Sequence, residues 1–388
     1  MVITLVMDQY VGDDGKITNG TTMTTLRFAK KLQEFGNEVR IVTCTKNSDD
    51  NVYVVPEYHF WFLDKIIHEQ GMAIAKPETK ILKEAFEGSD VIHFLMPFFL
   101  ARKGKKLADK MGIATTCAFH VQPENMTFSV GLGKMKWANE VIYRSFRGYY
   151  NKFTHIHCPS KMIANQLAIH GYTGKTHVIS NGVDKGFKPE KVERPKEYDG
   201  KIIVMMIGRY SKEKRQDLII NAISESKYKD KMVLVLCGVG PEKKNLQKLA
   251  AAKGVAVEFK FLQQPDLVKL CNYADVYVHA SDAEIEAIAC IEAFSCGIVP
   301  IISDSEISAT NQFALCDKNL FKHGDYLDLR DKMEYLIEHK EEKEELSKQY
   351  VEYAKQFELD NCVRELEKVF KQAVKEKKQE KEQLGENK

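Results

Sequence analysis

The sequence predicts an α/β protein made of two doubly wound parallel sheets. Short β-branched segments alternate with amphipathic helical segments along the chain, which is typical of parallel strands joined by crossover helices. The same alternation starts a second time at Lys201. Between the two copies, residues 185–200 are polar, contain two prolines and show no periodicity, which indicates a linker.

In each half, apolar runs predict the strands and helical periodicity predicts the helices. Met23, Leu26, Phe28 and Leu32 share one face of a helix, and Gly36 ends it. In the first half we expect this helix over 21–35 and strands over 2–7, 38–43, 91–94, 114–118, 156–158 and 178–179. In the second half we expect strands over 202–207, 232–237, 255–261, 276–279 and 298–302, with helices over 215–226, 242–253, 267–273 and 289–295.

These elements define four parts of the chain. We expect a first domain over residues 1–184, a linker over 185–200 and a second domain over 201–355. Residues 356–388 form a C-terminal helix that packs back toward the first domain and ends in a charged, frayed tail. Two such sheets enclose a cleft at the carboxyl ends of their strands, where α/β proteins bind ligands.

Composition predicts a cytoplasmic protein. Of the 388 residues, 44% are hydrophobic and 29% are charged, which is ordinary for a globular chain. No run approaches the about 18 apolar residues that span a bilayer, and the first strand lacks the flanks of a signal peptide. The nine cysteines include no CxxC pair, so we expect reduced, buried thiols and no zinc site.

Positive charge is concentrated in residues 101–188. This segment holds eleven Lys and three Arg against two Asp and two Glu, although the whole chain carries only +2. Such a block indicates an anionic partner, such as a phosphate, a lipid surface or a nucleic acid. A solvated basic face is the plain structural explanation. Because no nucleic-acid-binding motif accompanies the block, we expect no nucleic-acid partner.

The most informative segment of the second half runs over residues 276–303. A strand ends near Ser281, a loop carries Glu284, and the following helix presents Glu292 eight residues later. Carboxylates at these places suit hydrogen bonds to the vicinal hydroxyls of a sugar. Two glutamates by themselves are more often solvated surface groups.

Further candidates follow other strands. Arg209 and Lys214 lie in a strand-to-helix loop, where two cations can clamp a pyrophosphate, although isolated they would be surface charges. Gly238 begins a GVGP turn whose backbone can approach a nucleotide. In the first half, Gly20 opens a helix whose amides can bind phosphate, and His120 follows a strand, where it can hydrogen-bond a sugar or serve only the fold.

Taken together, these motifs resemble the family-four retaining glycosyltransferases of the GT-B fold. The E-x7-E spacing of Glu284 and Glu292 is accompanied by an A-x-x-C-G-x-x-P-I stretch over 293–301 and by V-I-x-N-G-V-D over 178–184. The resemblance covers nearly the whole chain. It implies two Rossmann-like domains facing each other across a cleft, the first on the acceptor side and the second binding the nucleotide sugar.

The resemblance also implies roles for the candidates. Glu284 approaches the transferred sugar, Glu292 holds the ribose, and His120 contacts the donor sugar. Arg209 and Lys214 neutralise the departing diphosphate, so a hexose moves with retention by front-face substitution, without a metal or another cofactor. The nucleotide sugar, UDP-glucose, is then a co-substrate. One departure concerns the donor: the family usually has E-G-F-G where this chain has Glu284-Ile-Glu-Ala287.

The acceptor is indicated by residues 98–153, where aromatic and basic residues alternate. This mixture fits a helix lying on an anionic membrane, and it fits equally a core-facing aromatic stripe with a solvated basic back. The pattern resembles bacterial diacylglycerol glucosyltransferases, which implies a glycolipid product of lipid metabolism and peripheral binding to the inner face of the cell membrane.

Three alternatives remain open on the sequence. A retaining glycosyltransferase acting on a soluble saccharide or a cell-surface polysaccharide precursor differs only in its acceptor. A nucleotide-sugar 2-epimerase shares the fold but should not combine the Arg209/Lys214 and Glu284/Glu292 pairs. A non-catalytic nucleotide-sugar-binding partner is favoured by the altered loop after Glu284.

Overall fold

The chain forms two compact units in a computed structural model. The structure describes the chain except for residues 12, 14–19, 61–63, 65–72, 130–134 and 386–388. The first unit comprises Met1–Pro123, Asn139–Asn181 and Asp360–Lys388, and the second comprises Glu124–Ala138 and Gly182–Leu359. The stretch expected to be a linker clusters with the second unit, where Phe187 and Tyr198 are buried.

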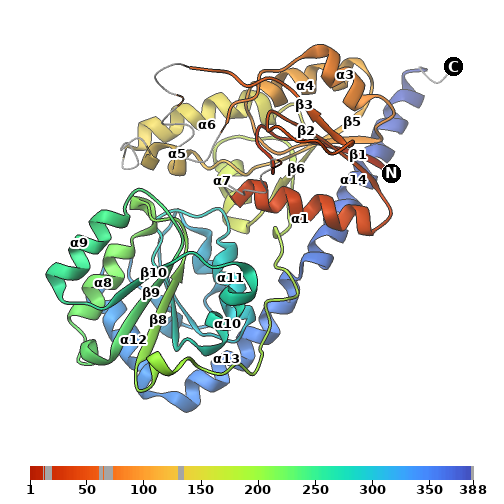
Figure 1. The fold of residues 1–388 in the computed structure, drawn as a ribbon. Coiled ribbons are helices and arrows are strands. Elements are labelled where there is room, and N and C mark those ends of the chain that lie inside the picture. Colours follow the sequence, from red (N-terminus) through yellow and green to blue (C-terminus); the bar gives the residue numbers. More distant parts are fainter. Residues whose placement is uncertain (12, 14–19, 61–63, 65–72, 130–134, 386–388) are drawn as a thin grey trace. The chain divides into compact units, whose positions relative to one another are not determined.

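The first unit is built on a seven-stranded parallel sheet in the order β3-β2-β1-β4-β5-β6-β7 (Figure 1). From the central β1 the chain winds outward to β3, returns to β4 and winds outward again, so the sheet is doubly wound. The strands are β1 (Val2–Val6), β2 (Glu38–Thr43), β3 (Val52–Val54), β4 (Val91–Phe94), β5 (Ala114–Ala118), β6 (His155–Cys158) and β7 (Lys175–Val178).

Within the described residues, seven helices carry residues of the first unit. Of these, α14 belongs to this unit although it is last in the chain: its Glu367 accepts a hydrogen bond from Asn37 Nδ2 (2.9 Å), and Phe370 packs on the His93 ring at 5.1 Å. These helices are α1 (Gly20–Glu34), α3 (Thr79–Phe86), α4 (Phe99–Lys110), α5 (Pro123–Ser129, mostly in the second unit), α6 (Lys136–Tyr150), α7 (Lys161–Ile169) and α14 (Leu359–Gln383).

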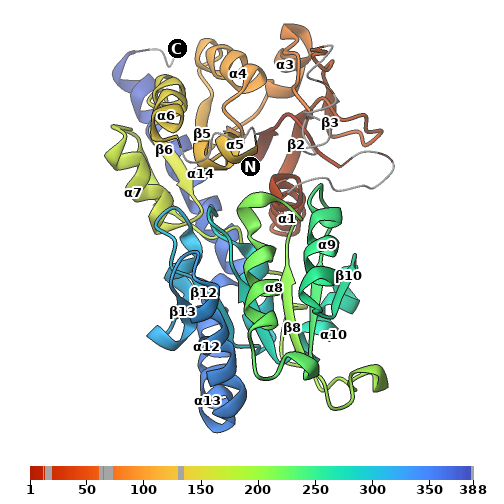
Figure 2. The same cartoon turned by 90° about the vertical axis from the view of Figure 1, so that its left-hand side faces the viewer.

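The second unit repeats the design with six parallel strands in the order β10-β9-β8-β11-β12-β13. Helix α8 packs against α9 and α12 (Figure 2), and α11 packs against α10 and α13. The strands are β8 (Ile202–Ile207), β9 (Met232–Cys237), β10 (Val257–Lys260), β11 (Val276–His279), β12 (Pro300–Ser303) and β13 (Leu320–Phe321). The helices are α8 (Gln216–Ser224), α9 (Lys243–Lys253), α10 (Gln264–Tyr273), α11 (Ile288–Ser295), α12 (Tyr326–Glu338) and α13 (Lys340–Ala354).

The predicted class of two doubly wound, Rossmann-like sheets is confirmed. One expected strand was misplaced: the strand expected over 178–179 is β7 at Lys175–Val178. Its residues are half-buried or exposed, because β7 is the edge of the sheet and contacts only β6 through the ladder. An edge strand therefore lacks the apolar run by which buried strands are recognised.

The aromatic stripe of α6 faces the core. Tyr143, Phe146, Tyr149 and Tyr150 are all buried, so the interpretation of these four rings as membrane-facing was wrong. They recur at helical spacing, and burying them is what holds α6 on the first sheet. On the same helix Trp137 keeps 66% of its surface exposed, and it remains available for other contacts.

Three imidazoles are buried together in the first unit. The His120 and His157 rings lie 5.4 Å apart, and the His93 and His157 rings lie 6.3 Å apart. His157 Nε2 lies 2.7 Å from the carbonyl oxygen of Ile179. Burial, together with the His157 imidazole, lowers the pKa of His120 to about 3, and burial lowers the pKa of His157 to about 4. All three rings are therefore held neutral in the folded protein.

These histidines predict loss of stability in acid. Because the folded state lowers the pKa of His157 from 6.5, its contribution is present above pH 6.5 and is lost as the pH falls toward 4. One such group makes the free energy of unfolding fall by up to about 1.4 kcal/mol per pH unit. His157→Gln keeps a donor for the Ile179 carbonyl and should weaken this dependence, as measured by urea unfolding between pH 7 and pH 5.

Asp8→Asn provides the opposite control. Burial raises the pKa of Asp8 to about 7, although the hydrogen bond from Ala75 N (2.9 Å) acts in the opposite direction and lowers this pKa. The protonated form of Asp8 therefore contributes stability that is lost as the pH rises through 7. Asp8→Asn should therefore gain stability relative to wild type at pH 8. An unchanged pH dependence in His157→Gln would contradict the account of the histidine cluster.

Candidate active site

The first half of the site is the loop that follows β8. It begins at Gly208 and carries Arg209 and Lys214 before α8 starts at Gln216. The buried Gln216 donates from Nε2 to the carbonyl oxygen of Arg209 (2.8 Å), which closes the loop on itself. A side chain on Gly208 would lie 3.8 Å from Lys214 Cδ, so the lysine stem runs past this glycine. The loop therefore presents both cations at the carboxyl end of β8.

The second half is the loop between β11 and α11. Lys214 Nζ forms an ion pair with Glu284 Oε1, and His279 Nε2 lies 2.8 Å from the same oxygen. Tyr277 lies on the same strand, with its hydroxyl 3.0 Å from His279 Nδ1. Within the part of the chain that the structure describes, no side chain bonds Glu284 Oε2, so this oxygen can accept a hydrogen bond from a ligand hydroxyl.

The electrostatics of this pair fix the charge of Glu284. Burial by itself would raise the pKa of this carboxyl, but the Lys214 ammonium and the His279 imidazole outweigh it and hold the pKa well below its usual range. Glu284 is therefore ionised at any physiological pH. An ionised, nearly buried carboxylate beside a cation is poised to orient a polar ligand and is costly to leave without its partner.

The backbone after Glu284 adopts a conformation that usually requires glycine. Ala287 has φ 68° and ψ 61°, in the left-handed region, directly before α11. A residue with a Cβ there costs about 1–2 kcal/mol, which is why a glycine was expected at this position. The helix that follows buries Glu292. Burial raises the pKa of Tyr277, and the nearby Cys290 and Cys271 thiols and the Glu284 and Glu292 carboxylates raise it further.

Two glycines let the loops after β8 and β9 touch. A Cβ on Gly238 would lie 2.1 Å from the carbonyl oxygen of Gly208, and one on Gly240 would lie 2.3 Å from the carbonyl oxygen of Tyr210. Tyr210 N also donates to the Val239 carbonyl (3.0 Å). The GVGP turn is thus required by close backbone packing, and this packing fixes the loop that carries Arg209.

The structure joins some predicted site residues and separates others. Lys214 and Glu284 are in contact, while Arg209, Gly238 and Glu292 lie in the same unit at the carboxyl ends of β8 and β9 or on α11. The remaining two candidates belong to the first unit: Gly20 begins α1, and His120 is buried with no hydrogen-bond partner for Nε2 among the described residues.

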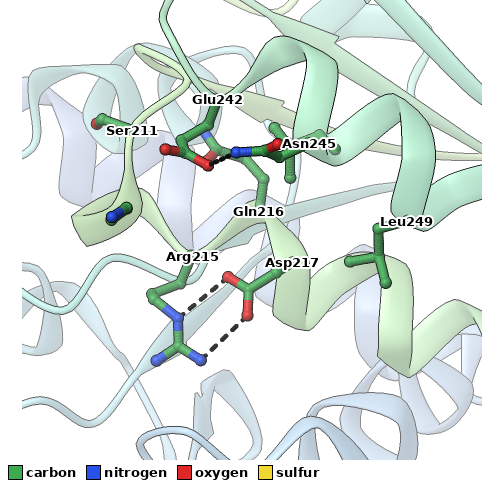
Figure 3. A pocket seen from close by; sticks show the side chains of 9 residues that line it. Ser211, Arg215, Gln216, Asp217, Glu242, Asn245 and Leu249 are labelled. Atoms are coloured by element: carbon green, nitrogen blue, oxygen red, sulfur yellow. Dashed lines mark hydrogen bonds and ion pairs between the residues drawn. The ribbon is translucent and has the colours of Figure 1, made fainter.

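Sequence reasoning missed several polar groups at this edge. His279 is the last residue of β11, and its place at a strand end is the signal that could have found it. Arg215 and Asp282 form an ion pair (3.2 Å) beside the Lys214–Glu284 pair. Arg215 also borders a pocket of about 270 Å³ between α8 and α9 (Figure 3). Its lining residues are Ser211, Lys212, Arg215, Gln216, Asp217, Glu242, Asn245, Leu246 and Leu249.

The described residues contain neither a group of metal ligands nor a membrane-spanning helix. No three His, Cys, Asp or Glu side chains in that part of the chain are grouped so as to hold a metal ion. None of its helices combines the length and apolar character needed to cross a membrane. All nine cysteines are free thiols, and seven of them are buried.

Sequence families match both halves of the chain. Residues 18–187 match Glycosyltransferase Family 4, and residues 187–357 match Glycosyl transferases group 1. With the two doubly wound sheets, these matches indicate a glycosyltransferase of the GT-B fold. Together the two matches span residues 18–357, so the glycosyltransferase class that the motifs predicted is confirmed. No curated protein matches it significantly.

Two of the similar solved structures share the fold over nearly the whole chain. HepE from Anabaena, in complex with UDP and glucose, is 16% identical, with a TM-score of 0.73, and the match covers 96% of this chain and 100% of that chain. Sucrose-phosphate synthase from Thermosynechococcus elongatus is 15% identical, with a TM-score of 0.74, covering 96% and 98%. The catalytic domain of cholesterol-α-glucosyltransferase from Helicobacter pylori is 43% identical over 39% of this chain and 96% of that chain, with a TM-score of 0.39.

The close packing of the two glycine loops predicts a large effect of one methyl group. Gly240→Ala places a Cβ against backbone atoms of Tyr210 that cannot move without distorting β8, so we expect a loss of about 2–4 kcal/mol in the free energy of unfolding. Gly148→Ala is the matched control, because a Cβ there meets no atom within 4 Å and α6 should gain about 0.5–1 kcal/mol. Denaturant unfolding of both variants measures the difference, and equal stabilities would contradict the packing account.

Proposed function

We propose that this protein is a retaining hexosyltransferase that moves glucose from UDP-glucose to a membrane lipid acceptor such as diacylglycerol. The observation that carries the proposal is the Lys214–Glu284 pair at the carboxyl edge of the second sheet. It combines a cation suited to a diphosphate with a carboxylate whose free oxygen suits a sugar hydroxyl. Arg209, on the same loop, supplies the second positive charge.

The proposed reaction needs positioning and charge stabilisation from the protein. The bond between the sugar anomeric carbon and the diphosphate oxygen breaks, and a bond to the acceptor oxygen forms on the same face. The acceptor hydroxyl gives its proton to the departing diphosphate. Lys214 and Arg209 stabilise the negative charge that grows on the diphosphate, Glu284 holds the sugar, and Glu292 holds the ribose.

The first domain contributes the remaining candidates. A neutral His120 with an unpartnered ring nitrogen is suited to one hydrogen bond with the donor sugar. Gly20 stands at the start of α1, where the first helix amides are suited to a phosphate, and a Cβ there would meet nothing within 4 Å. UDP-glucose is the first donor to test, because a protein of the same fold, HepE from Anabaena, forms a complex with it.

The acceptor proposal rests on one exposed stripe of α6. Trp137 and Val141 are 66% and 60% exposed one helical turn apart, and Lys136 and Arg144 are exposed beside them. On α4 the exposed Phe99 precedes the exposed cations Lys103 and Lys106. Apolar side chains flanked by cations are typical of a surface that inserts among anionic headgroups. Lys134, also expected there, lies outside the described residues.

Turnover of the donor tests the leaving-group role. Lys214→Ala should lower kcat for UDP-glucose hydrolysis about a hundredfold at saturating donor, because the charge that it stabilises develops in the transition state. Lys212→Ala, on the same turn but exposed, is the matched control and should retain turnover. Near-native kcat in Lys214→Ala would remove this assignment.

Calorimetry with UDP, combined with turnover assays, distinguishes an enzyme from a non-catalytic nucleotide-sugar-binding protein. Glu292→Ala should weaken UDP binding by about 1–3 kcal/mol through loss of a charged hydrogen bond. If the wild type binds UDP but turns over no nucleotide sugar with any acceptor, the protein is a nucleotide-sugar-binding partner and not an enzyme. Turnover with soluble saccharides alone would assign the saccharide acceptor instead of the lipid.

Vesicle binding tests the lipid acceptor. Each cation near an anionic surface contributes about 1 kcal/mol, so binding to phosphatidylserine vesicles should weaken as salt rises. Lys136→Ser/Arg144→Ser should lower binding and its salt dependence, whereas Trp137→Ser should lower binding at every salt concentration. Ile169→Ser, which removes an apolar residue on α7 that is 80% exposed, is the control. A wild-type protein that ignores such vesicles at low salt would contradict the lipid proposal.

A further inference from the structure

Arg215 occupies a backbone conformation that glycine would hold without strain. Its φ of 54° and ψ of 36° are left-handed, and among the described residues only Ala287 is another non-glycine with positive φ. The arginine side chain does not cap α8, although it stands at the N-cap position. Such strain persists only where surrounding contacts hold it, and it is common at functional sites. The contacts of the guanidinium must therefore compensate for the free-energy cost of the left-handed backbone at Arg215.

The contacts of the guanidinium reach two segments of the second unit. Nε and Nη2 bind the two carboxylate oxygens of Asp217 at 3.1 and 3.2 Å, on the first turn of α8 (Figure 3). Nη1 binds Asp282 Oδ1 at 3.2 Å, on the loop that carries Glu284. Arg215 thus spans from the helix that follows Lys214 to the loop that holds its carboxylate partner.

Three contacts in succession join these two segments. The Glu213 carbonyl accepts from Asp282 N (2.7 Å), Arg215 pairs with Asp282, and Lys214 pairs with Glu284. Asp282 is itself anchored, since Ser305 Oγ donates to its carbonyl (2.5 Å) and His323 Nε2 lies 3.7 Å from its carboxylate. The side chains of residues 213–215 have little freedom to shift relative to residues 282–284.

We propose that Arg215 and Asp282 are positioning residues that hold the Lys214 ammonium against Glu284. This proposal rests on the proposed function, in which Lys214 and Glu284 bind the diphosphate and the sugar during transfer. The arginine restrains the turn after Lys214 from one side and the loop before Glu284 from the other. Without it, the short turn over Lys212–Lys214 is tied to the β11–α11 loop by one backbone hydrogen bond and the Lys214 pair alone.

Arg215→Gly tests the proposal in the full chain. Glycine accepts the left-handed conformation, so this change removes the guanidinium without adding strain. Competitive acetylation followed by mass spectrometry reports how strongly Lys214 is held. We expect Lys214 to be labelled several-fold faster in Arg215→Gly than in wild type, with Arg330→Ala as the control that loses another Arg–Asp pair, on α12.

The same variant separates positioning from folding. With UDP-glucose, kcat should fall about ten- to a hundredfold while KM changes less than about threefold, because a misplaced cation stabilises the departing diphosphate poorly. Arg215→Lys should recover part of kcat, and Asp282→Asn should reproduce the loss. The double variant Arg215→Gly/Asp282→Asn should be no worse than either single variant, because both break one link.

Three results would overturn the proposal. The first is wild-type labelling of Lys214 in Arg215→Gly, and the second is a kcat within twofold of wild type. A parallel fall in kcat and thermal stability that Arg215→Lys does not recover would show a purely structural role and would also overturn it. If the wild type turns over no donor, the proposed function fails, but the labelling of Lys214 still decides whether Arg215 positions it.

Discussion

The contact between Lys214 and Glu284 is the interaction on which the second unit's site depends. A nearly buried carboxylate is stable only if its charge is compensated, and here the lysine and His279 both bind the same oxygen. Removing Lys214 or Glu284 would leave the charge of the other residue poorly compensated, and both side chains are largely buried. The loops after β8 and β11 are therefore tied to each other by charge as well as by the sheet. A ligand that carries both a diphosphate and a hydroxylated ring can exploit both members of the pair.

The parallel sheet explains why these groups meet. Strands β8 and β11 are neighbours in the same direction, so the loops at their carboxyl ends start side by side. Close backbone approach at Gly238 and Gly240 then fixes the first loop against its other neighbour, β9. Rigidity is obtained at the cost of left-handed backbone at Arg215 and Ala287. Strained residues flank the ion pair on both segments, which is consistent with a site whose geometry is held for function.

The sequence predicted most of the second unit and less of the first. Buried parallel strands such as β8, β9 and β11 are continuous apolar runs, and their bounds were predicted correctly. The edge strand β7 begins with three polar residues and was misplaced. Helix α6 was open to two interpretations, because a core-facing stripe and a membrane-facing stripe have the same spacing. Lys214 and Glu284 were predicted from their motifs, and the structure places them in contact. Arg215, Asp282 and His279 were not predicted from the sequence. Arg215 and Asp282 belong to segments about 65 residues apart that meet only in the folded chain, and His279 is marked only by its place at the end of a strand. No local sequence pattern encodes either feature.

A crystal structure of the protein with UDP bound tests the central claim most directly. The account predicts the diphosphate within hydrogen-bond distance of Lys214 and Arg209, the ribose hydroxyls on Glu292, and Glu284 Oε2 facing the space where the sugar would sit. A diphosphate bound away from the loop after β8, with the Lys214–Glu284 pair unchanged and closed to the ligand, would contradict it.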